Sequence, residues 1–520
     1  MSDPAIQPPD FRAFSAELRA RARSCTQGAV FAREWPAGTA LISARGGRSF
    51  GELHDNANRL AHHLRACGLG PGDAVALMCS NRPEFVEVLL AASRAGLRLT
   101  PISTQLTPAE VAYIVRDCQA RLFFVESPES SAGVVDVPQI VIGSAHYSQV
   151  LAASPAAELA APVAGSLMLY TSGTTGRPKG VYKRTAEWIE PQFEGSFANY
   201  RPGDVQLCAG PAYHAAPLLF DLRWPLASGV PIVLLEQWDT AEVLAALARH
   251  RVTHAHMVPT MFQRLLAVPA EERARHDLSA LRYVLHGAAP CPLPVKHALI
   301  DWLGPVITEY YAATEGGDNV HVSSADWLRR PGTVGRLDAA QGHRILDDNG
   351  ADVPQGSVGR IFFRAPAEGR FEYFGDPDKT AAAYRDGRFT LGDLGYVDDE
   401  GWLFLTGRSA DTIISGGVNI YPREVDEVLA SHPAVAQACT VGAPDDDWGE
   451  RVVSVVVPLP GEPAGDALAA QLLAYAGQRL ARYKCPRDIV FDSELPHTTT
   501  GKLLRGQVRQ RFWQGRVKDI

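Results

Sequence analysis

The sequence lacks the features that would place the chain in or across a membrane. No stretch approaches the ~20 consecutive apolar residues of a transmembrane helix. The first residues, MSDPAIQPPDFRAFSAELRA, contain neither the basic start nor the apolar run of a signal peptide. The eight cysteines are scattered without a Cys-x-x-Cys pair, so we expect reduced, packed thiols rather than disulfides or a zinc site. These absences predict a cytoplasmic protein with no membrane partner.

Long runs of one charge are also missing. The net charge of −8 is spread along the 520 residues, and no basic face is evident, so we expect no nucleic-acid partner. Lysine is scarce: of the 50 basic residues only seven are lysines, at positions 179, 183, 296, 379, 484, 502 and 518. A lysine inside a glycine-rich loop is therefore more informative here than in an average sequence.

The pattern of apolar residues predicts more than one domain, because 520 residues exceed one ordinary core. A helix at Phe50–Cys67, a strand at Ala74–Cys79 and a helix at Pro83–Ala95 begin an alternation that continues to about residue 125 and returns between Pro231 and Leu285. Helices that alternate with strands are typical of parallel sheets covered by helices.

From about residue 330 the sequence changes to short strands with glycine turns, which indicates a smaller β-rich lobe. After Gly407-Arg408 the remaining strands and helices look independent. We therefore predict an α/β fold with a large domain of helix-covered parallel sheets, the small β-rich lobe, and a further domain after a boundary at Arg408–Asp411.

A glycine-rich loop follows the apolar segment Leu167–Tyr170. Glycines let the backbone turn tightly, and hydroxyls and an ammonium add donors around one point, which suits a polyphosphate. The ordinary P-loop is excluded, because Lys179 is preceded by Pro178 and followed by Gly180. The phosphate-binding residues predicted in this loop are Thr171, Ser172, Gly173, Thr174, Thr175 and Lys179.

This loop resembles the phosphate-binding signature of the adenylate-forming (ANL) superfamily: acyl-CoA synthetases, luciferases and the adenylation domains of peptide synthetases. Further segments that match this superfamily follow in the expected order over about residues 40 to 510. The resemblance implies ATP as a substrate, Mg²⁺ as a cofactor, and a reaction that begins with formation of an acyl-adenylate. It also implies a large N-terminal domain of stacked αβα layers plus the small β-rich lobe at residues 1–408, a hinge at 409–411, and a mobile α+β C-terminal domain at 412–520.

The segment Tyr310-Tyr311-Ala312-Ala313-Thr314-Glu315 resembles the family's Tyr-Gly-x-Thr-Glu motif. By this resemblance Tyr310, Tyr311 and Ala312 belong to the nucleotide site, with Tyr311 against the adenine. Thr314 contacts a phosphate and Glu315 is the metal ligand that helps to hold Mg²⁺, whose charge offsets that of the departing pyrophosphate. Ala312 replaces the usual glycine.

Three more segments complete the nucleotide site implied by the resemblance. Gly287, Ala288 and Ala289 form the adenine-binding turn, Asp393 accepts hydrogen bonds from both ribose hydroxyls, and Arg408 reaches the ribose and phosphate. Gly417 belongs to a loop that swings in after adenylation and lines the passage of the pantetheine thiol. Ala410 stands where many relatives carry Asp or Lys, so the energetics of domain rotation are open.

Lys502, in Pro496-His497-Thr498-Thr499-Thr500-Gly501-Lys502, resembles the mobile lysine that meets both the acid and the α-phosphate. Negative charge grows on the α-phosphoryl group as the carboxylate attacks, so an ammonium there stabilises the transition state more than the ground state.

The acid pocket is implied by Pro211–Pro217, whose His214 borders the acyl group, and by the small and apolar residues from Ala215 to Phe220. These favour a hydrophobic carboxylic acid over an amino acid. Asp221 is unusual at its position and leaves three interpretations open. It pairs with Arg223 or a neighbouring helix, it binds a polar group of the acid, or it deprotonates an incoming amine as in stand-alone amide synthetases.

Two acceptors follow from these alternatives. The leading hypothesis is an acyl-CoA synthetase, in which CoA is the co-substrate and Arg482, Lys484 and Arg487 supply basic surface for its nucleotide end. The second is an amide ligase with an amine or amino acid as acceptor and Asp221 as general base. A non-catalytic sensor of adenylates would not need Lys502, Glu315 and Asp393 together. The sequence leaves a homodimer open.

Overall fold

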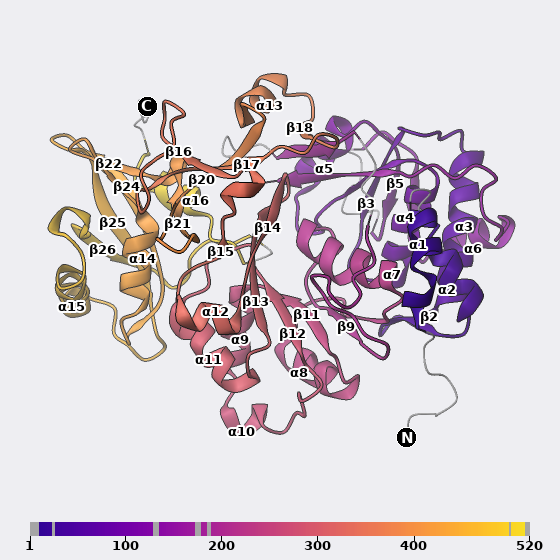
Figure 1. Ribbon diagram of the computed structural model, residues 1–520, viewed down its shortest axis with the longest axis horizontal. Helices are drawn as coiled ribbons and strands as arrows, with labels where there is room; N and C mark the ends of the chain where they lie inside the picture. The colour runs from indigo at the N-terminus through magenta and orange to yellow at the C-terminus, as the bar shows by residue number, and fades with distance from the viewer. Residues whose placement is uncertain are drawn as a thin grey trace.

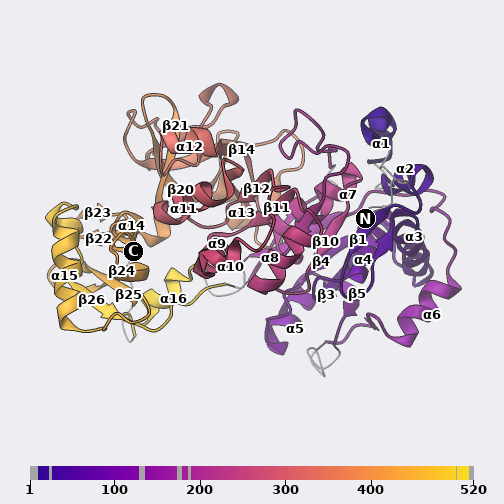
Figure 2. The ribbon, with the colours of Figure 1, turned by 90° about the horizontal axis from the view of Figure 1, so that it is seen from below.

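The computed structural model describes residues 10–22, 26–127, 135–171, 178–184, 189–498 and 501–514, without the side chains of 317–319. Within this part of the chain the strands form four sheets. Three belong to a large body, and the fourth lies with the last helices in a separate C-terminal domain at the left of Figures 1 and 2. Among the described helices none combines the length and apolar character needed to cross a bilayer.

Two large, mainly parallel sheets form the N-terminal body. In spatial order the first contains β14 (Gly316–Ser323), β13 (Ile307–Ala313), β12 (Tyr283–His286), β11 (His254–Met257), β9 (Gln206–Cys208), β10 (Ile232–Leu234), β1 (Thr39–Ile42) and β2 (Arg48–Ser49). The second contains β18 (Phe371–Tyr373), β8 (Lys179–Lys183), β7 (Ser166–Thr171), β4 (Arg98–Pro101), β3 (Ala74–Met78), β5 (Ala120–Val125) and β6 (Gln139–Val141).

The helices of the body cover these sheets and fill the space between them (Figure 1). They are α1 (Ser15–Ala22), α2 (Gly28–Glu34), α3 (Phe50–Ala66), α4 (Pro83–Arg94), α5 (Pro108–Asp117), α6 (Ala145–Ala153), α7 (Trp224–Ser228), α8 (Thr240–Arg249), α9 (Pro259–Ala267), α10 (Ala270–Arg273), α11 (Leu293–Leu303) and α12 (Ser324–Arg329). One apolar core joins α3 and α4 to strands of both sheets. The predicted stacking of αβα layers is confirmed.

Helix α3 shows how the sequence sets these elements. The Ser49 hydroxyl oxygen accepts a hydrogen bond from the backbone N–H of Glu52, and the Glu52 carboxylate accepts one from the backbone N–H of Ser49, so both halves of a capping box are present. Leu53, Leu60 and Leu64 recur at helical spacing and are buried. The helix ends before Gly68, which has a φ of 76° that glycine adopts without strain.

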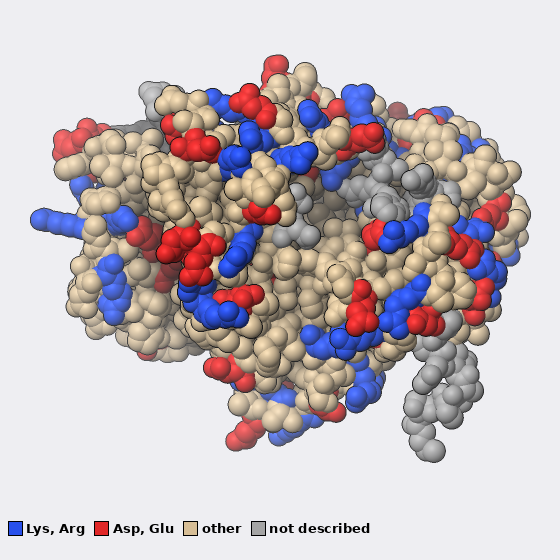
Figure 3. Space-filling view, viewed as in Figure 1, with Lys and Arg blue, Asp and Glu red and all other residues tan. Residues whose placement is uncertain are grey.

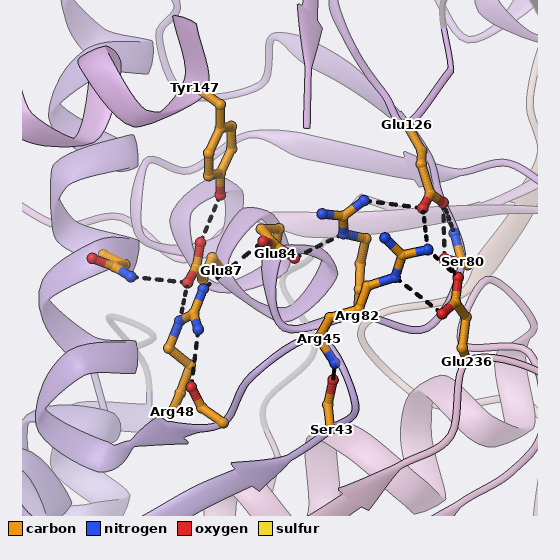
Figure 4. Close-up of polar contacts among 12 residues, drawn as sticks. Ser43, Arg45, Arg48, Ser80, Arg82, Glu84, Glu87, Glu126, Tyr147 and Glu236 are labelled. Carbon is orange, nitrogen blue, oxygen red and sulfur yellow. Dashed lines mark hydrogen bonds and ion pairs between the residues drawn. The ribbon is translucent and has the colours of Figure 1, made fainter. Parts of the chain in front are cut away.

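A buried polar network ties α4 to its neighbours (Figure 4). Glu87 is fully buried and accepts hydrogen bonds from Arg48 (2.7 Å), Asn56 (2.9 Å) and the Tyr147 hydroxyl (2.7 Å). A buried carboxylate needs such partners, because losing water is costly for a charge. The network therefore fixes α3, α4 and α6 relative to one another.

The predicted β-rich lobe is the third sheet, with β15 (Gly335–Arg336), β21 (Trp402–Arg408), β20 (Arg388–Val397), β17 (Gly359–Arg364), β16 (Arg344–Leu346) and β19 (Tyr384–Arg385), next to α13 (Pro377–Ala383). The C-terminal domain contains β23 (Val418–Ile420), β22 (Ile413–Ser415), β25 (Gly449–Pro458), β24 (Val435–Asp445), β26 (Asp488–Phe491), α14 (Pro422–Ala430), α15 (Asp466–Gly477) and α16 (Arg505–Gln510). Between them, Ser409–Asp411 forms a single 3₁₀ turn. The α+β character of this domain is as predicted.

Candidate active site

Two cavities meet beside the C-terminal ends of β12 and β13. The first, which we call the sheet cavity, has a volume of about 850 Å³ and lies between the two large sheets. The second, the interdomain cavity, has a volume of about 380 Å³ and lies between the body and the C-terminal domain. Residues Tyr310–Ala313 of β13 line both, so this strand end is the partition between them. Figure 3 shows a hollow near the middle of the molecule, on a face where charges of both signs are interspersed.

The turn after β12 forms one wall of the interdomain cavity and contains Gly287, Ala288 and Ala289. A Cβ atom at Gly287 would lie 2.6 Å from the ring of Tyr310, so only glycine lets the turn approach this ring. Ala288 has a φ of 67°, in the left-handed region. The resulting surface of backbone and methyl groups, next to Tyr311, can accept a flat base.

Asp393 and Arg408 lie opposite each other on the paired strands β20 and β21. One oxygen of Asp393 accepts a hydrogen bond from the Tyr311 hydroxyl at 2.7 Å, and the other accepts one from Arg408 Nε at 3.0 Å. Burial, and then the charge of Asp393, raise the pKa of Tyr311 well above its usual value, so this hydroxyl stays a donor. The carboxylate is held in place on the wall of the interdomain cavity, where it can accept further hydroxyl donors.

Lys502 reaches the same cavity from the C-terminal domain. A tight turn holds it: its backbone N–H donates to Thr498 Oγ1 at 3.0 Å, and Gly501 has a φ of 74°. Burial and then the charge of Arg408 lower the pKa of Lys502, while Asp393, Asp411 and Glu315 oppose the shift. The structure therefore brings Lys502, Asp393, Arg408 and the Gly287 turn together.

The phosphate side of the site is described in part. Thr171 and Lys179 are paired at the ends of β7 and β8, and Lys179 Nζ donates to Asp376 Oδ2 at 3.1 Å. Ser172, Gly173, Thr174 and Thr175, which connect these two strands, lie outside the described residues. Thr314 lines the sheet cavity.

Glu315 accepts a hydrogen bond from the Tyr373 hydroxyl at 2.9 Å. Among the described residues no group of three or more His, Cys, Asp or Glu side chains forms a complete metal site. A single carboxylate next to a polyphosphate site is nevertheless the donor set that Mg²⁺ uses with nucleotides, because the phosphates and water supply the remaining ligands. Glu315 thus fits a Mg²⁺ ion carried by a nucleotide.

Sequence reasoning missed Lys379, on α13. Its ammonium lies 4.0 Å from the ring centroid of Tyr373 and close to the ammonium of Lys179. Burial and then Lys179 lower the pKa of Lys379 to about 8, while Glu315 and Asp376 oppose the shift. Two neighbouring ammonium groups favour an anion between them. The scarcity of lysine was the sequence feature that could have drawn attention to Lys379, which is one of only seven lysines.

The sheet cavity is lined by apolar and aromatic side chains, with some polar groups. The aromatic lining residues are Phe197, Phe220, Trp224, Tyr283, Tyr310, Tyr311 and His321. A π-helical turn, Pro217–Arg223, forms one wall through Leu218, Leu219, Phe220 and Arg223. His214 lies just before this wall, next to the lining residue Ala215, and burial lowers its pKa to about 4.

Six of the described predicted site residues line neither cavity: Thr171, Lys179, His214, Asp221, Glu315 and Gly417. Asp221 is fully buried behind the wall, and its hydrogen-bond partner is Gln206 (2.7 Å) rather than Arg223. Gly417, with a φ of 78°, is in the turn between β22 and β23 and lines neither cavity in this arrangement. Of the basic residues considered for CoA, Lys484 pairs with Glu424 (2.7 Å) and Arg487 with Asp445 (3.3 Å).

Comparison with known proteins places these features in a family. Residues 29–370 match the model of the AMP-binding enzymes, and residues 424–502 match that of the AMP-binding enzyme C-terminal domain. Feruloyl-CoA synthase from Amycolatopsis sp is 35% identical over 498 residues, covering 92% of this chain and 97% of that protein.

Two solved structures are similar over nearly the whole chain. The anthranilate CoA ligase AuaEII in complex with anthranoyl-AMP is 26% identical with a TM-score of 0.81, covering 93% of this chain and 96% of that one. The amide bond synthetase McbA from Marinactinospora thermotolerans is 28% identical with a TM-score of 0.81, covering 95% and 99%. The chain therefore belongs to the AMP-binding, adenylate-forming (ANL) superfamily and is an AMP-forming carboxylate ligase.

Proposed function

We propose that this ligase activates a hydrophobic carboxylic acid with ATP and transfers the acyl group to the thiol of CoA. The observation that carries the proposal is the junction of the two cavities at Tyr310–Ala313. An acid in the apolar sheet cavity would present its carboxylate at this junction. A nucleotide in the interdomain cavity would present its α-phosphate at the same point, within the reach of Lys502.

In the first half-reaction a carboxylate oxygen attacks the α-phosphorus of ATP, and the bond to pyrophosphate breaks. The Gly287 turn and Tyr311 hold the adenine, and Asp393 accepts the ribose hydroxyls, with Arg408 beside it. Lys502 stabilises the charge that grows on the α-phosphoryl group. A Mg²⁺ ion at Glu315 would neutralise phosphate charge.

In the second half-reaction the CoA thiolate attacks the acyl carbonyl, and AMP leaves. We propose residues 1–408 and 412–520 as the two domains and 409–411 as the hinge that lets Gly417 and its loop replace Lys502 at the site. Basic side chains at Arg482, Lys484 and Arg487 lie on the same C-terminal domain. Feruloyl-CoA synthase and the anthranilate CoA ligase, both similar to this chain, support CoA as the acceptor and an aromatic acid among the substrates.

Amide formation is the second candidate, and the similarity to McbA favours it. The role of Asp221 as the base for an amine gains no support from the geometry, since this carboxyl group does not line the sheet cavity. An amide ligase would thus need another group, or an amine that arrives uncharged.

The test is pyrophosphate release with ATP, Mg²⁺ and a panel of aromatic and medium-chain acids, followed by addition of CoA or amines and product identification by mass. We expect acid-dependent pyrophosphate release and a CoA thioester. Lys502→Ala should slow adenylation by about 100-fold or more, and Asp393→Ala should raise the KM for ATP. Amide product without CoA would favour the second candidate, and no pyrophosphate release with any acid would refute both.

A further inference from the structure

Asp221 lies on the hidden side of the wall that faces the acid. Its neighbours Leu218, Leu219 and Phe220 line the sheet cavity, whereas the Asp221 side chain points into the body and is fully buried. The wall is a π-helical turn, a rare conformation that is frequently found at functional sites. Such a turn requires contacts that hold it in place.

Asp221 makes those contacts with two strands of the sheet. Its Oδ1 accepts a hydrogen bond from Gln206 Nε2 on β9 at 2.7 Å, and Gln206 in turn accepts one from the Tyr200 hydroxyl at 2.8 Å. Its Oδ2 has no hydrogen-bond partner among the described residues and lies 3.8 Å from Nδ1 of His256 on β11. The carboxyl group thus spans the gap between wall and sheet.

His256 extends this chain of contacts to the partition between the cavities. Its Nε2 lies 3.3 Å from the hydroxyl of Tyr310, whose ring lines both cavities. The ring of Phe220 packs edge-on against Tyr310, with centroids 4.9 Å apart, and lies 5.5 Å from His256. Wall, sheet and partition are therefore joined through Asp221, His256 and Tyr310.

Full burial favours the uncharged forms of both ionisable side chains, Asp221 and His256. Burial raises the pKa of Asp221 well above its usual value, although Gln206 and the backbone N–H of His256 oppose the shift. Burial lowers the pKa of His256 to about 3. The Gln206 amide donates to Oδ1, whereas Oδ2 faces His256 Nδ1 at 3.8 Å, a packing contact that is longer than a hydrogen bond. Nε2 of the same ring lies 3.3 Å from the Tyr310 hydroxyl.

We infer that Asp221 is a positioning residue: as a neutral carboxylic acid it anchors the π-helical wall to β9 and β11 and, through His256, fixes the Tyr310 ring between the acid and the nucleotide. This inference rests on the proposed function for its kinetic consequences. It assigns to Asp221 a role in the binding of the acid and removes it from proton transfer to or from an acceptor.

The anchor is tested with Asp221→Asn and Asp221→Ala. Asparagine is uncharged, keeps an oxygen for Gln206 and has nearly the same size against His256, so we expect the KM for the acid to stay within about twofold of the wild-type value. Alanine removes both contacts, so we expect the KM for the acid to rise about tenfold while kcat/KM for ATP changes less than about twofold.

A double-mutant cycle then tests the path through His256. Tyr310→Phe keeps the ring and removes the hydroxyl, so its effect and that of Asp221→Ala on the KM for the acid should be clearly non-additive. Additive effects would show that the wall and the partition are independent and would overturn the role of His256.

Deuterium exchange of the peptide over Pro217–Ser228 tests the anchor without catalysis. We expect faster exchange in Asp221→Ala and wild-type exchange in Asp221→Asn. If the wild-type enzyme releases no pyrophosphate, the proposed function fails, and this comparison still decides the anchor. A neutral anchor would be refuted if Asp221→Asn and Asp221→Ala raised the KM for the acid equally. It would also be refuted if both variants lost the same protection from deuterium exchange. Loss of amide product alone in Asp221→Asn would instead make Asp221 a base.

Discussion

At the scale of single residues, the ammonium of Lys379 is the least expected part of the site. It lies beside Lys179 and Tyr373, on the side where the sequence predicts the phosphates. Two ammonium groups repel each other in the free enzyme, and a bound polyphosphate would relieve that repulsion. Lys379 therefore has a predicted role in ATP binding that its position in the sequence does not reveal.

Replacing Lys379 with methionine should raise the KM for ATP by roughly five- to tenfold, because a charge-assisted contact to phosphate is lost. The lowered pKa of about 8 adds a pH dependence. As the pH rises through 8, wild-type Lys379 loses its proton, so kcat/KM for ATP should fall above pH 8. Lys379→Arg keeps its charge at that pH and should show no such fall; a fall that persists in Lys379→Arg would assign it to another group.

Gly501 decides whether Lys502 can approach the body. A Cβ atom there would lie 2.0 Å from Thr260 Oγ1 on α9, and the φ of 74° disfavours any side chain. Gly501→Ala should therefore slow adenylation by at least about tenfold. Thioester formation from a supplied acyl-adenylate should not change, because that step does not require this contact.

Gly506→Ala is the matched control, since a Cβ atom at Gly506 meets nothing within 4 Å. Stopped-flow measurement of pyrophosphate release separates the two half-reactions. If Gly501→Ala adenylates at the wild-type rate, the approach of the C-terminal domain seen here is not the one that adenylation uses.

At the scale of secondary-structure elements, Glu87 sets the packing of α3, α4 and α6 (Figure 4). Glu87→Ala leaves donors of Arg48, Asn56 and Tyr147 without this acceptor. We therefore expect the free energy of unfolding to fall by about 3–5 kcal/mol. Glu87→Gln keeps an oxygen for Arg48 and should cost clearly less. Calorimetry should give the highest midpoint of thermal unfolding for the wild type, a lower one for Glu87→Gln and the lowest for Glu87→Ala.

Glu17→Ala provides the comparison for a surface charge. Glu17 pairs with Arg33 on the exposed side of the N-terminal helices, so its loss should barely move the midpoint. If Glu87→Ala moves it no more than Glu17→Ala does, the buried network does not hold the helices together.

At the scale of the whole molecule, the short turn Ser409–Asp411 is the hinge that we propose between the two domains. Arg509 on α16 donates to the carbonyl of Ala410 at 3.0 Å, and Arg505, paired with Asp426 at 2.6 Å, lies 3.9 Å from Asp411. Since Ala410 has no polar side chain, these arginines hold the turn from the C-terminal side. We expect a rotation of the C-terminal domain about the turn to break the hydrogen bond from Arg509 to the carbonyl of Ala410.

Arg509→Ala should therefore weaken the arrangement in which Lys502 lines the interdomain cavity. We expect adenylation to slow by roughly threefold to tenfold, while thioester formation from acyl-adenylate stays unchanged or becomes faster. Arg511→Ala, which removes only a pair with Asp492, is the control. Equal slowing of both half-reactions in Arg509→Ala would exclude a role in domain arrangement.

The sequence by itself determined the elements and the order of the motifs. The predicted helix Phe50–Cys67 agrees within one residue with α3, because caps and apolar periodicity are local signals. The family could also be predicted from the sequence, since Lys179, Glu315, Asp393 and Lys502 belong to local motifs with fixed neighbours. The roles of these four residues at a nucleotide stay predictions.

Only the tertiary structure decided contacts between residues that are distant in the chain. The position of Lys379 next to Lys179 depends on the pairing of β18 with β8, and no local pattern encodes that pairing. The environment of Asp221 depends on Gln206 and His256, which parallel strands β9 and β11 bring beneath the π-helical turn. A side chain's charge and role follow from its burial and its neighbours, and those are fixed when the sheets assemble.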